Sequence, residues 1–249
     1  MQPRQRAWAL FSVGFLSCAL LFVLFAPLAA LWPTLAWRNR LSLVAGRWWS
    51  RICLRICGVR PRYEGLEHLD AGPAVLTFNH TNHLDFFLLS RLAKAPCLVF
   101  GKAELARVVF LGWGWALGGH PLIRRDDRAH WQRELDRVEA LLRQGWSTIV
   151  APEGSRSRDG RVQPFKKGGF HLALRARLPV LPVVILGGAP RWRGGPVPGE
   201  VTVRVLAPIS TADWREETLD AHVADVRRRY LELLEGSEVG GGDAVVTGA

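Results

Sequence analysis

The first part of the chain is dominated by one long apolar run. From Ala7 to Trp37 the sequence has 31 residues without a charged side chain. A straight α-helix of that length would reach roughly 46 Å, whereas the hydrocarbon core of a bilayer is about 30 Å thick. Pro27 and Pro33 interrupt the run, so two arrangements are open. Residues 7–26 could form one membrane-spanning helix, or the run could enter one leaflet, break near Pro27 and return. The length of the run and the basic segment behind it disfavour a third arrangement, a cleaved signal peptide.

The next segment, Arg38–Cys57, has the pattern of an interfacial helix, with an ordinary amphipathic helix packed on the body as the alternative. Four of its arginines fall on one side at helical spacing, and most of its apolar side chains fall on another. More arginines follow the apolar run than precede it: Arg38, Arg40, Arg47, Arg51 and Arg55 against Arg4 and Arg6. By the positive-inside rule, this excess predicts an inner (cytoplasmic) membrane protein whose remaining chain faces the cytoplasm.

After this arm, short apolar runs alternate with helical patterns. The runs typical of buried strands are 74–78, 98–101, 148–151, 180–186 and 201–206, and the helical patterns are 84–92, 127–144, 167–177 and 215–235. Such alternation predicts an α/β layered domain with a mixed central sheet flanked by helices. We therefore divide the chain into a membrane-inserting and interfacial arm (1–57), an α/β domain (58–235) and a flexible, glycine-rich tail (236–249).

The charge of the chain is concentrated in the arm. The net charge is +11, yet the first 62 residues hold nine arginines and no acidic residue, so the rest is nearly balanced. A near-neutral body with a basic, apolar arm points to membrane lipids as the partner and not to nucleic acid. Cys18, Cys53, Cys57 and Cys97 have no spacing typical of a disulfide framework or a metal site.

The first candidate for chemistry is the segment Asn79–Asp85, which directly follows a predicted strand. His80 on the loop could face Asp85 on the first helical turn, and that carboxylate would orient the imidazole and leave its other nitrogen free as a general base. The alternative is helix capping, with Asn82 as the cap and Asp85 three residues later. His83 lies two residues before Asp85 and is the weaker partner, because residues two apart on a helix do not face each other.

The second candidate is the segment Ala151–Ser157, which also follows an apolar strand. Gly154 would expose backbone amides, Arg156 could bind a phosphate through two hydrogen bonds, and Glu153 could orient that arginine. A charged surface turn is the alternative. Two further blocks, Gly119–Arg125 and Leu178–Val183, carry little information when each is taken alone.

Taken together and in order, these four blocks resemble the 1-acyl-sn-glycerol-3-phosphate acyltransferase family. That family shows Asn-His-x4-Asp, then Gly-x-x-Phe-Ile-x-Arg, then Phe-Pro-Glu-Gly-Thr-Arg-Ser, then a proline-bearing apolar strand. Residues 101–105 are similar to its Lys-x-Glu-Leu segment and residues 164–168 to its Phe-Lys-x-Gly stretch. The departures are mild: Ala151 and Leu122 each replace Phe, and Ser155 replaces Thr but keeps the hydroxyl.

The resemblance implies an O-acyltransferase of phospholipid biosynthesis. It would transfer an acyl chain from acyl-CoA or acyl-carrier protein to the free hydroxyl of 1-acyl-glycerol-3-phosphate, with another lysolipid, such as lyso-ornithine lipid or lysophosphatidylethanolamine, as the alternative acceptor. It also implies that His80 and Asp85 are catalytic, and that neither a cofactor nor a metal ion takes part. The residues implied to bind the substrate are Lys102, Arg125, Glu153, Gly154, Ser155 and Arg156.

Two rival classes of enzyme lack their motifs in this sequence. A serine hydrolase would carry Gly-x-Ser-x-Gly between a strand and a helix, and the chain has no such segment. A P-loop nucleotide-binding enzyme would carry Gly-x4-Gly-Lys-[Ser/Thr], which is also missing. A non-catalytic membrane-binding module would leave the pair of His80 and Asp85 without a role.

Overall fold

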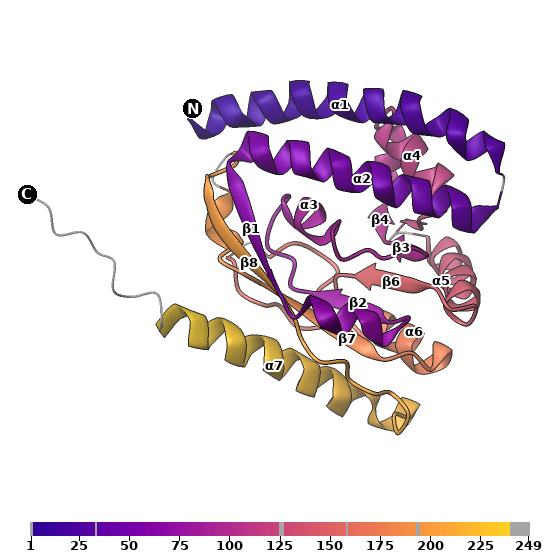
Figure 1. Cartoon of the computed structure of the whole chain (residues 1–249). Coiled ribbons are helices and arrows are strands. Elements are labelled where there is room, and N and C mark those ends of the chain that lie inside the picture. The colour runs from indigo at the N-terminus through magenta and orange to yellow at the C-terminus, as the bar shows by residue number, and fades with distance from the viewer. Residues whose placement is uncertain (1, 33, 125–126, 158, 193–194, 240–249) are drawn as a thin grey trace, which may run out of the picture.

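The computed structural model describes residues 2–32, 34–124, 127–157, 159–192 and 195–239 (Figure 1). It consists of an N-terminal helical hairpin and an α/β body. The hairpin lies along one side of the body, and a long C-terminal helix lies along the opposite side. The predicted fold class, a layered α/β domain with a mixed sheet behind a helical arm, is confirmed.

The hairpin is made of α1 (Pro3–Leu31) and α2 (Leu35–Cys57). α1 is apolar on all sides and exposes most of its large side chains, and among the described helices it is the one long and apolar enough to cross a membrane. α2 is amphipathic, as predicted, and its buried face carries Leu43, Cys53 and Leu54 against the body. The two helices therefore differ in role. α1 exposes an apolar surface, and α2 packs the hairpin against the body.

α1 and α2 run antiparallel and are joined along their length (Figure 1). At one end the Arg6 guanidinium donates a hydrogen bond to the carbonyl of Ile56 (3.3 Å). Near the middle the Trp49 indole donates to the carbonyl of Gly14 (2.7 Å). Of the two arrangements that the sequence left open, the break near Pro27 is not present, because the helix continues through this residue and the chain reverses only after α1 ends.

The central sheet has six strands in the order β1–β8–β7–β2–β6–β3. β7 and β8 pair antiparallel, and every other neighbouring pair is parallel, so the sheet is mixed. A second, two-stranded sheet joins β4 and β5. The bounds are β1 Val59–Glu64, β2 Val75–Phe78, β3 Cys97–Val99, β4 Gly101–Lys102, β5 Leu122–Ile123, β6 Ser147–Val150, β7 Val180–Leu186 and β8 Gly199–Val205.

Helices cover both faces of the sheet and enclose two apolar cores. α2 and α3 pack on one face, and α5, α6 and α7 pack on the other. Alternate side chains of β7 serve both cores: Val183 and Ile185 point to the first, and Val180 and Val184 to the second. The remaining helices are α3 Asp85–Leu89, α4 Leu111–Leu117, α5 Arg128–Leu142, α6 Gly168–Ala176 and α7 Leu219–Val239, with 3₁₀ segments η1 Leu66–Ala71, η2 Ala103–Arg107, η3 Ala189–Arg191 and η4 Glu216–Thr218.

The structure departs from the sequence prediction in several elements. The helix predicted at 84–92 is only five residues long, and β1, β4, β5 and α4 were not predicted. The final helix continues to Val239, four residues into the segment predicted as a flexible tail, and the rest of that tail lies outside the described residues. The predicted boundary at residue 57 coincides with the end of α2. The division into three units stays a prediction, since α2 shares its core with the body.

Candidate active site

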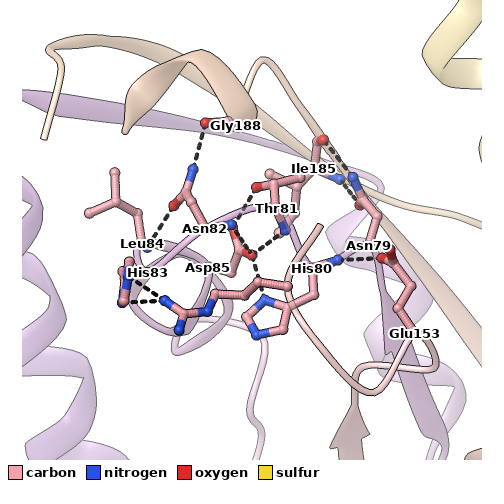
Figure 2. A network of polar contacts seen from close by, with 11 residues as sticks. Asn79, His80, Thr81, Asn82, His83, Leu84, Asp85, Glu153, Ile185 and Gly188 are labelled. Atoms are coloured by element: carbon pink, nitrogen blue, oxygen red, sulfur yellow. Dashed lines mark hydrogen bonds and ion pairs between the residues drawn. The ribbon is translucent and has the colours of Figure 1, made fainter. Parts of the chain in front are cut away.

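Three loops meet at one edge of the sheet, at the carboxyl ends of the neighbouring strands β7, β2 and β6. The loop after β2 carries Asn79–Leu84, the loop after β6 carries Ala151–Ser157, and the loop after β7 carries Gly187 and Gly188. Figure 2 shows His80 and Asp85 within the network of polar contacts that joins these loops. Such an edge is where open α/β sheets usually hold their sites.

The structure brings the two predicted catalytic side chains together. His80 Nδ1 lies 2.8 Å from Asp85 Oδ2, and the two side chains point toward each other in Figure 2. Asp85 is fully buried, and its carboxylate also accepts the Thr81 and Asn82 amides and the Thr81 hydroxyl. Because an ionised carboxylate only accepts, Nδ1 carries the shared proton and Nε2 keeps its lone pair. His80 can therefore act as a base through Nε2.

Two buried asparagines fix the shape of this loop. The Asn79 side chain exchanges two hydrogen bonds with the backbone of Ile185, at 2.7 and 3.0 Å. Asn82 Nδ2 donates to the carbonyl of Gly188 (2.6 Å), and its Oδ1 accepts the amide of Leu84 (2.7 Å). The helix cap expected at Asn82 is not formed, because α3 begins after Leu84 and has no side-chain cap. Asn82 instead joins the turn before α3 to the loop after β7. The role of Asn79 was not predicted from the sequence, because its partner, Ile185, lies on β7 and more than 100 residues away.

Glu153 is a buried support for the same loop. One of its carboxylate oxygens accepts the His80 amide (2.7 Å), and the other accepts the Gln163 amide (2.8 Å). Burial raises the pKa of Glu153, and these two amides act against that rise. The Ser157 amide donates to the His80 carbonyl (2.8 Å), so the loop after β6 holds His80 on both sides. Glu153 therefore contacts backbone amides and not Arg156, the residue that we expected it to orient.

The other predicted substrate-binding residues lie on the open side of the site. Lys102, Ser155 and Arg156 are exposed. Gly154 has a φ of +71°, a backbone conformation that favours glycine, and a Cβ there would lie 3.0 Å from Lys166 Nζ. Arg125 lies outside the described residues. Two exposed basic side chains, Lys102 on β4 and Arg156 on the loop after β6, are thus present among the described residues of this set.

His83 lies beside Arg156 and not beside Asp85. Arg156 Nη1 is 2.6 Å from His83 Nδ1 and also contacts Nε2. The His83 ring packs on Trp192, with 4.6 Å between ring centroids. Burial and the positive charge of Arg156 lower the pKa of His83. The ring is therefore mainly neutral at pH 7 and offers apolar surface and a lone pair next to the exposed guanidinium.

Comparisons with known proteins agree with this geometry. Residues 60–186 match the Acyltransferase family. A 1-acyl-sn-glycerol-3-phosphate acyltransferase of Limnanthes douglasii is 34% identical over 225 residues, which cover 88% of this chain and 77% of that protein. An enzyme of the same name from Saccharomyces cerevisiae is 31% identical over 81% of this chain and 68% of its own length. The chain belongs to the 1-acyl-sn-glycerol-3-phosphate acyltransferase family.

A solved structure supports the fold of this acyltransferase. The crystal structure of the 1-acyl-sn-glycerophosphate acyltransferase PlsC from Thermotoga maritima superposes with a TM-score of 0.64. It covers 89% of this chain and 97% of its own, at 23% sequence identity. The family match spans the His80 loop and the loop that holds it, so both loops belong to the acyltransferase domain. Within the described residues, no group of three or more His, Cys, Asp or Glu side chains could hold a metal ion.

Proposed function

We propose that this acyltransferase moves an acyl chain from a thioester donor, acyl-CoA or acyl-carrier protein, to the free hydroxyl of 1-acyl-glycerol-3-phosphate, forming phosphatidic acid. The observation that carries the proposal is the buried carboxylate of Asp85 holding His80 with Nε2 free, next to exposed cationic side chains. The names of the related enzymes from Limnanthes and yeast support the choice of acceptor.

In the proposed reaction, His80 is the base and the thioester carbonyl carbon is the atom attacked. His80 Nε2 takes the proton of the acceptor hydroxyl while the hydroxyl oxygen attacks the thioester carbonyl carbon. The tetrahedral intermediate collapses with cleavage of the C–S bond. The departing thiolate receives the proton from His80, which returns to its neutral form. Asp85 stabilises the protonated ring between these two transfers.

The acceptor's phosphate is assigned to the exposed basic side chains. Arg156 offers a planar pair of donors that matches two phosphate oxygens, and Lys102 and Arg125 supply further positive charge. In this proposal Gly154 gives the turn its left-handed backbone, Ser155 contributes its hydroxyl, and Glu153 keeps the His80 loop in place. Glu153 would thus act on the substrate through the backbone and not by direct contact.

The surface of α1 supports a location at the inner membrane, with the catalytic body on the cytoplasmic side. Acceptor and product are both lipids, so an apolar helix that exposes its side chains brings the enzyme to its substrates. The excess of arginines after the apolar run supports the cytoplasmic side.

The deciding experiment is an acceptor and donor panel with the purified full-length chain. We expect phosphatidic acid from lysophosphatidic acid with at least one of the two donors, and a rate higher than that with lysophosphatidylethanolamine or lyso-ornithine lipid. His80→Ala serves as the inactive control and His83→Ala as the matched histidine control. Faster acylation of either alternative acceptor would overturn the choice of acceptor, and thioester loss without any acceptor would point to hydrolysis.

A further inference from the structure

The catalytic body has one apolar patch of its own on the outside. Beyond α2, the large apolar side chains that the described residues expose are Val108 (40% exposed), Val109 (42%) and Trp113 (51%). All three lie in the turn between η2 and α4 or on α4 itself. From Leu105 to Ile123 the sequence has no acidic residue. Three such side chains within six residues form an apolar patch, and exposing this patch to water is unfavourable.

This patch is continuous with the apolar surface of α1. Phe110, in the middle of the patch, packs against Phe15 and Phe22 of α1, with ring centroids 5.7 and 5.8 Å apart. Trp113 also contacts Phe22, at 5.8 Å. α1 exposes ten large apolar side chains along its length, and Phe15, which packs on Phe110, is one of them. A single apolar surface therefore extends from the hairpin onto the body.

The backbone of Phe110 shows that packing fixes the position of the patch. This residue has a φ of +64°, a conformation that bulky side chains rarely adopt and that costs on the order of 1–3 kcal/mol. Gly112 is also required, because a Cβ there would lie 2.3 Å from the carbonyl oxygen of Leu105. The contacts of Phe110 with Phe15 and Phe22 offset the strain, so α1 holds the turn in place.

The inner side of α4 contacts α3 next to the catalytic aspartate. Trp115 is buried and packs on Phe86, with ring centroids 5.5 Å apart. Phe86 is the residue after Asp85 in α3. One short helix thus carries Trp113 on its outer side and, two residues later, a side chain that contacts the residue next to the catalytic aspartate.

We propose that Val108, Val109 and Trp113 form a lipid-inserting wedge of the catalytic body, which enters the leaflet beside α1 and sets the depth of His80 at the membrane surface. The continuity with α1 and the lack of acidic residues favour lipid over a protein partner or a second copy of the chain. Insertion of the wedge concerns membrane contact and stands apart from the proposed acceptor, whereas its effect on turnover rests on the proposed function.

Depth-dependent quenching tests the insertion without any turnover. A bimane probe is placed on Val109→Cys, on Leu20→Cys in α1 and on Ala224→Cys, an exposed position of α7 across the sheet. Cys18→Ser is included in every variant, and the other three cysteines are buried. In vesicles of phosphatidylglycerol and phosphatidylethanolamine with brominated acyl chains, we expect quenching at 109 close to that at 20 and well above that at 224. Quenching at 109 no greater than at 224 would overturn the wedge.

An activity measurement then tests the consequence. Val109→Asp puts a carboxylate where lipid is expected, so activity on vesicle-embedded acceptor should fall about tenfold, with activity on a short-chain, water-soluble acceptor retained. Ala224→Asp is the matched control and should change neither. An equal loss on both acceptors would contradict the wedge. If the wild-type chain acylates no lysophosphatidic acid, the proposed function fails, and the quenching result still decides the wedge.

Discussion

The loops after β2 and β6 meet at one sheet edge, and their polar side chains are held in different ways. In the first loop Asn79 and Asn82 are buried, as is Asp85 at the start of α3, and their side chains form hydrogen bonds with neighbouring groups. In the second loop only Glu153 is buried in this way, whereas Ser155 and Arg156 are exposed. The pair of His80 and Asp85 is therefore held by buried contacts, whereas the side chains proposed to bind the phosphate lie at the surface.

The largest effect is expected at the base. His80→Ala should lower kcat by about 100-fold or more, because Nε2 is the group that would take the hydroxyl proton. His83→Ala should be much milder, since its ring contacts Arg156 and Trp192 and has no contact with Asp85 among the described hydrogen bonds. Steady-state kinetics on both purified variants give the comparison. If His83→Ala lowered kcat as much as His80→Ala does, the assignment of His80 as the base would be wrong.

Glu153→Gln tests whether the second loop supports the first. The amide side chain would turn an NH₂ group toward one of the two backbone amides that Glu153 now accepts. We expect the unfolding free energy to fall by about 1–3 kcal/mol and kcat by about 10- to 100-fold, because His80 shifts with its backbone. Thermal melts and kinetics measure the two effects. Loss of acceptor affinity alone, with kcat unchanged, would favour a direct contact between Glu153 and substrate.

The exposed guanidinium should contribute mainly to binding. Arg156→Ala should raise KM for lysophosphatidic acid about tenfold, since a charge-assisted hydrogen bond to phosphate contributes about 1.5–3 kcal/mol. Arg156→Lys should recover only part of this, because an ammonium does not bind two oxygens in a planar pair. Kinetics with the acceptor and the donor varied in turn provide the measurement. An equal rise of both KM values would argue against a contact specific to the acceptor.

The smallest effect concerns His120, a buried histidine that has no carboxylate partner among the residues that the structure describes. Its Nδ1 accepts the Val99 amide (3.3 Å), so Nε2 carries the proton and faces the Ser42 hydroxyl (3.1 Å). Burial and the charge of Arg137 lower the pKa of His120 to about 4. Between that value and the usual pKa of about 6.5 the unfolded chain binds more protons, so stability falls as pH falls. From about pH 7 to about pH 5.5 the loss should be about 1 kcal/mol.

The matched variant for this effect is His120→Gln, which keeps one donor and one acceptor and does not titrate. Unfolding of both proteins in the same detergent, across that pH range, measures the difference between their slopes. Parallel slopes would mean that His120 makes no contribution to the acid sensitivity. A steeper slope for the variant would reverse the sign of the prediction.

Sequence patterns predicted the parts of the site that depend on local spacing. The contact between His80 and Asp85 spans five residues across a loop and a first helical turn, so motif spacing was enough to expect it. The alternation of apolar runs likewise predicted β2, β6 and β7, whose ends hold the site. The order of the motifs led to the family, which the similarity to related enzymes confirms.

Contacts between distant segments could not be predicted in the same way. Glu153 was expected beside Arg156, its near neighbour in sequence, but its partners are the amides of His80 and Gln163. α4 was missed because it is seven residues long and contains two glycines and two tryptophans, which give no amphipathic period. Its position depends on Phe15 and Phe22, some ninety residues earlier in the chain. The partners of Glu153 and the position of α4 are therefore determined by tertiary contacts and not by local propensity.

The pairing of β1 with β8 has a consequence for how the chain is assembled during synthesis. β1 directly follows the hairpin, and its first residue, Val59, pairs with Gly199, 140 residues later. At about 5–20 residues per second, the ribosome needs on the order of ten seconds to make the intervening chain. The hairpin is thus fully synthesised, and free to meet lipid, well before the edge of the sheet can close. Contact between the hairpin and lipid can therefore precede completion of the catalytic body.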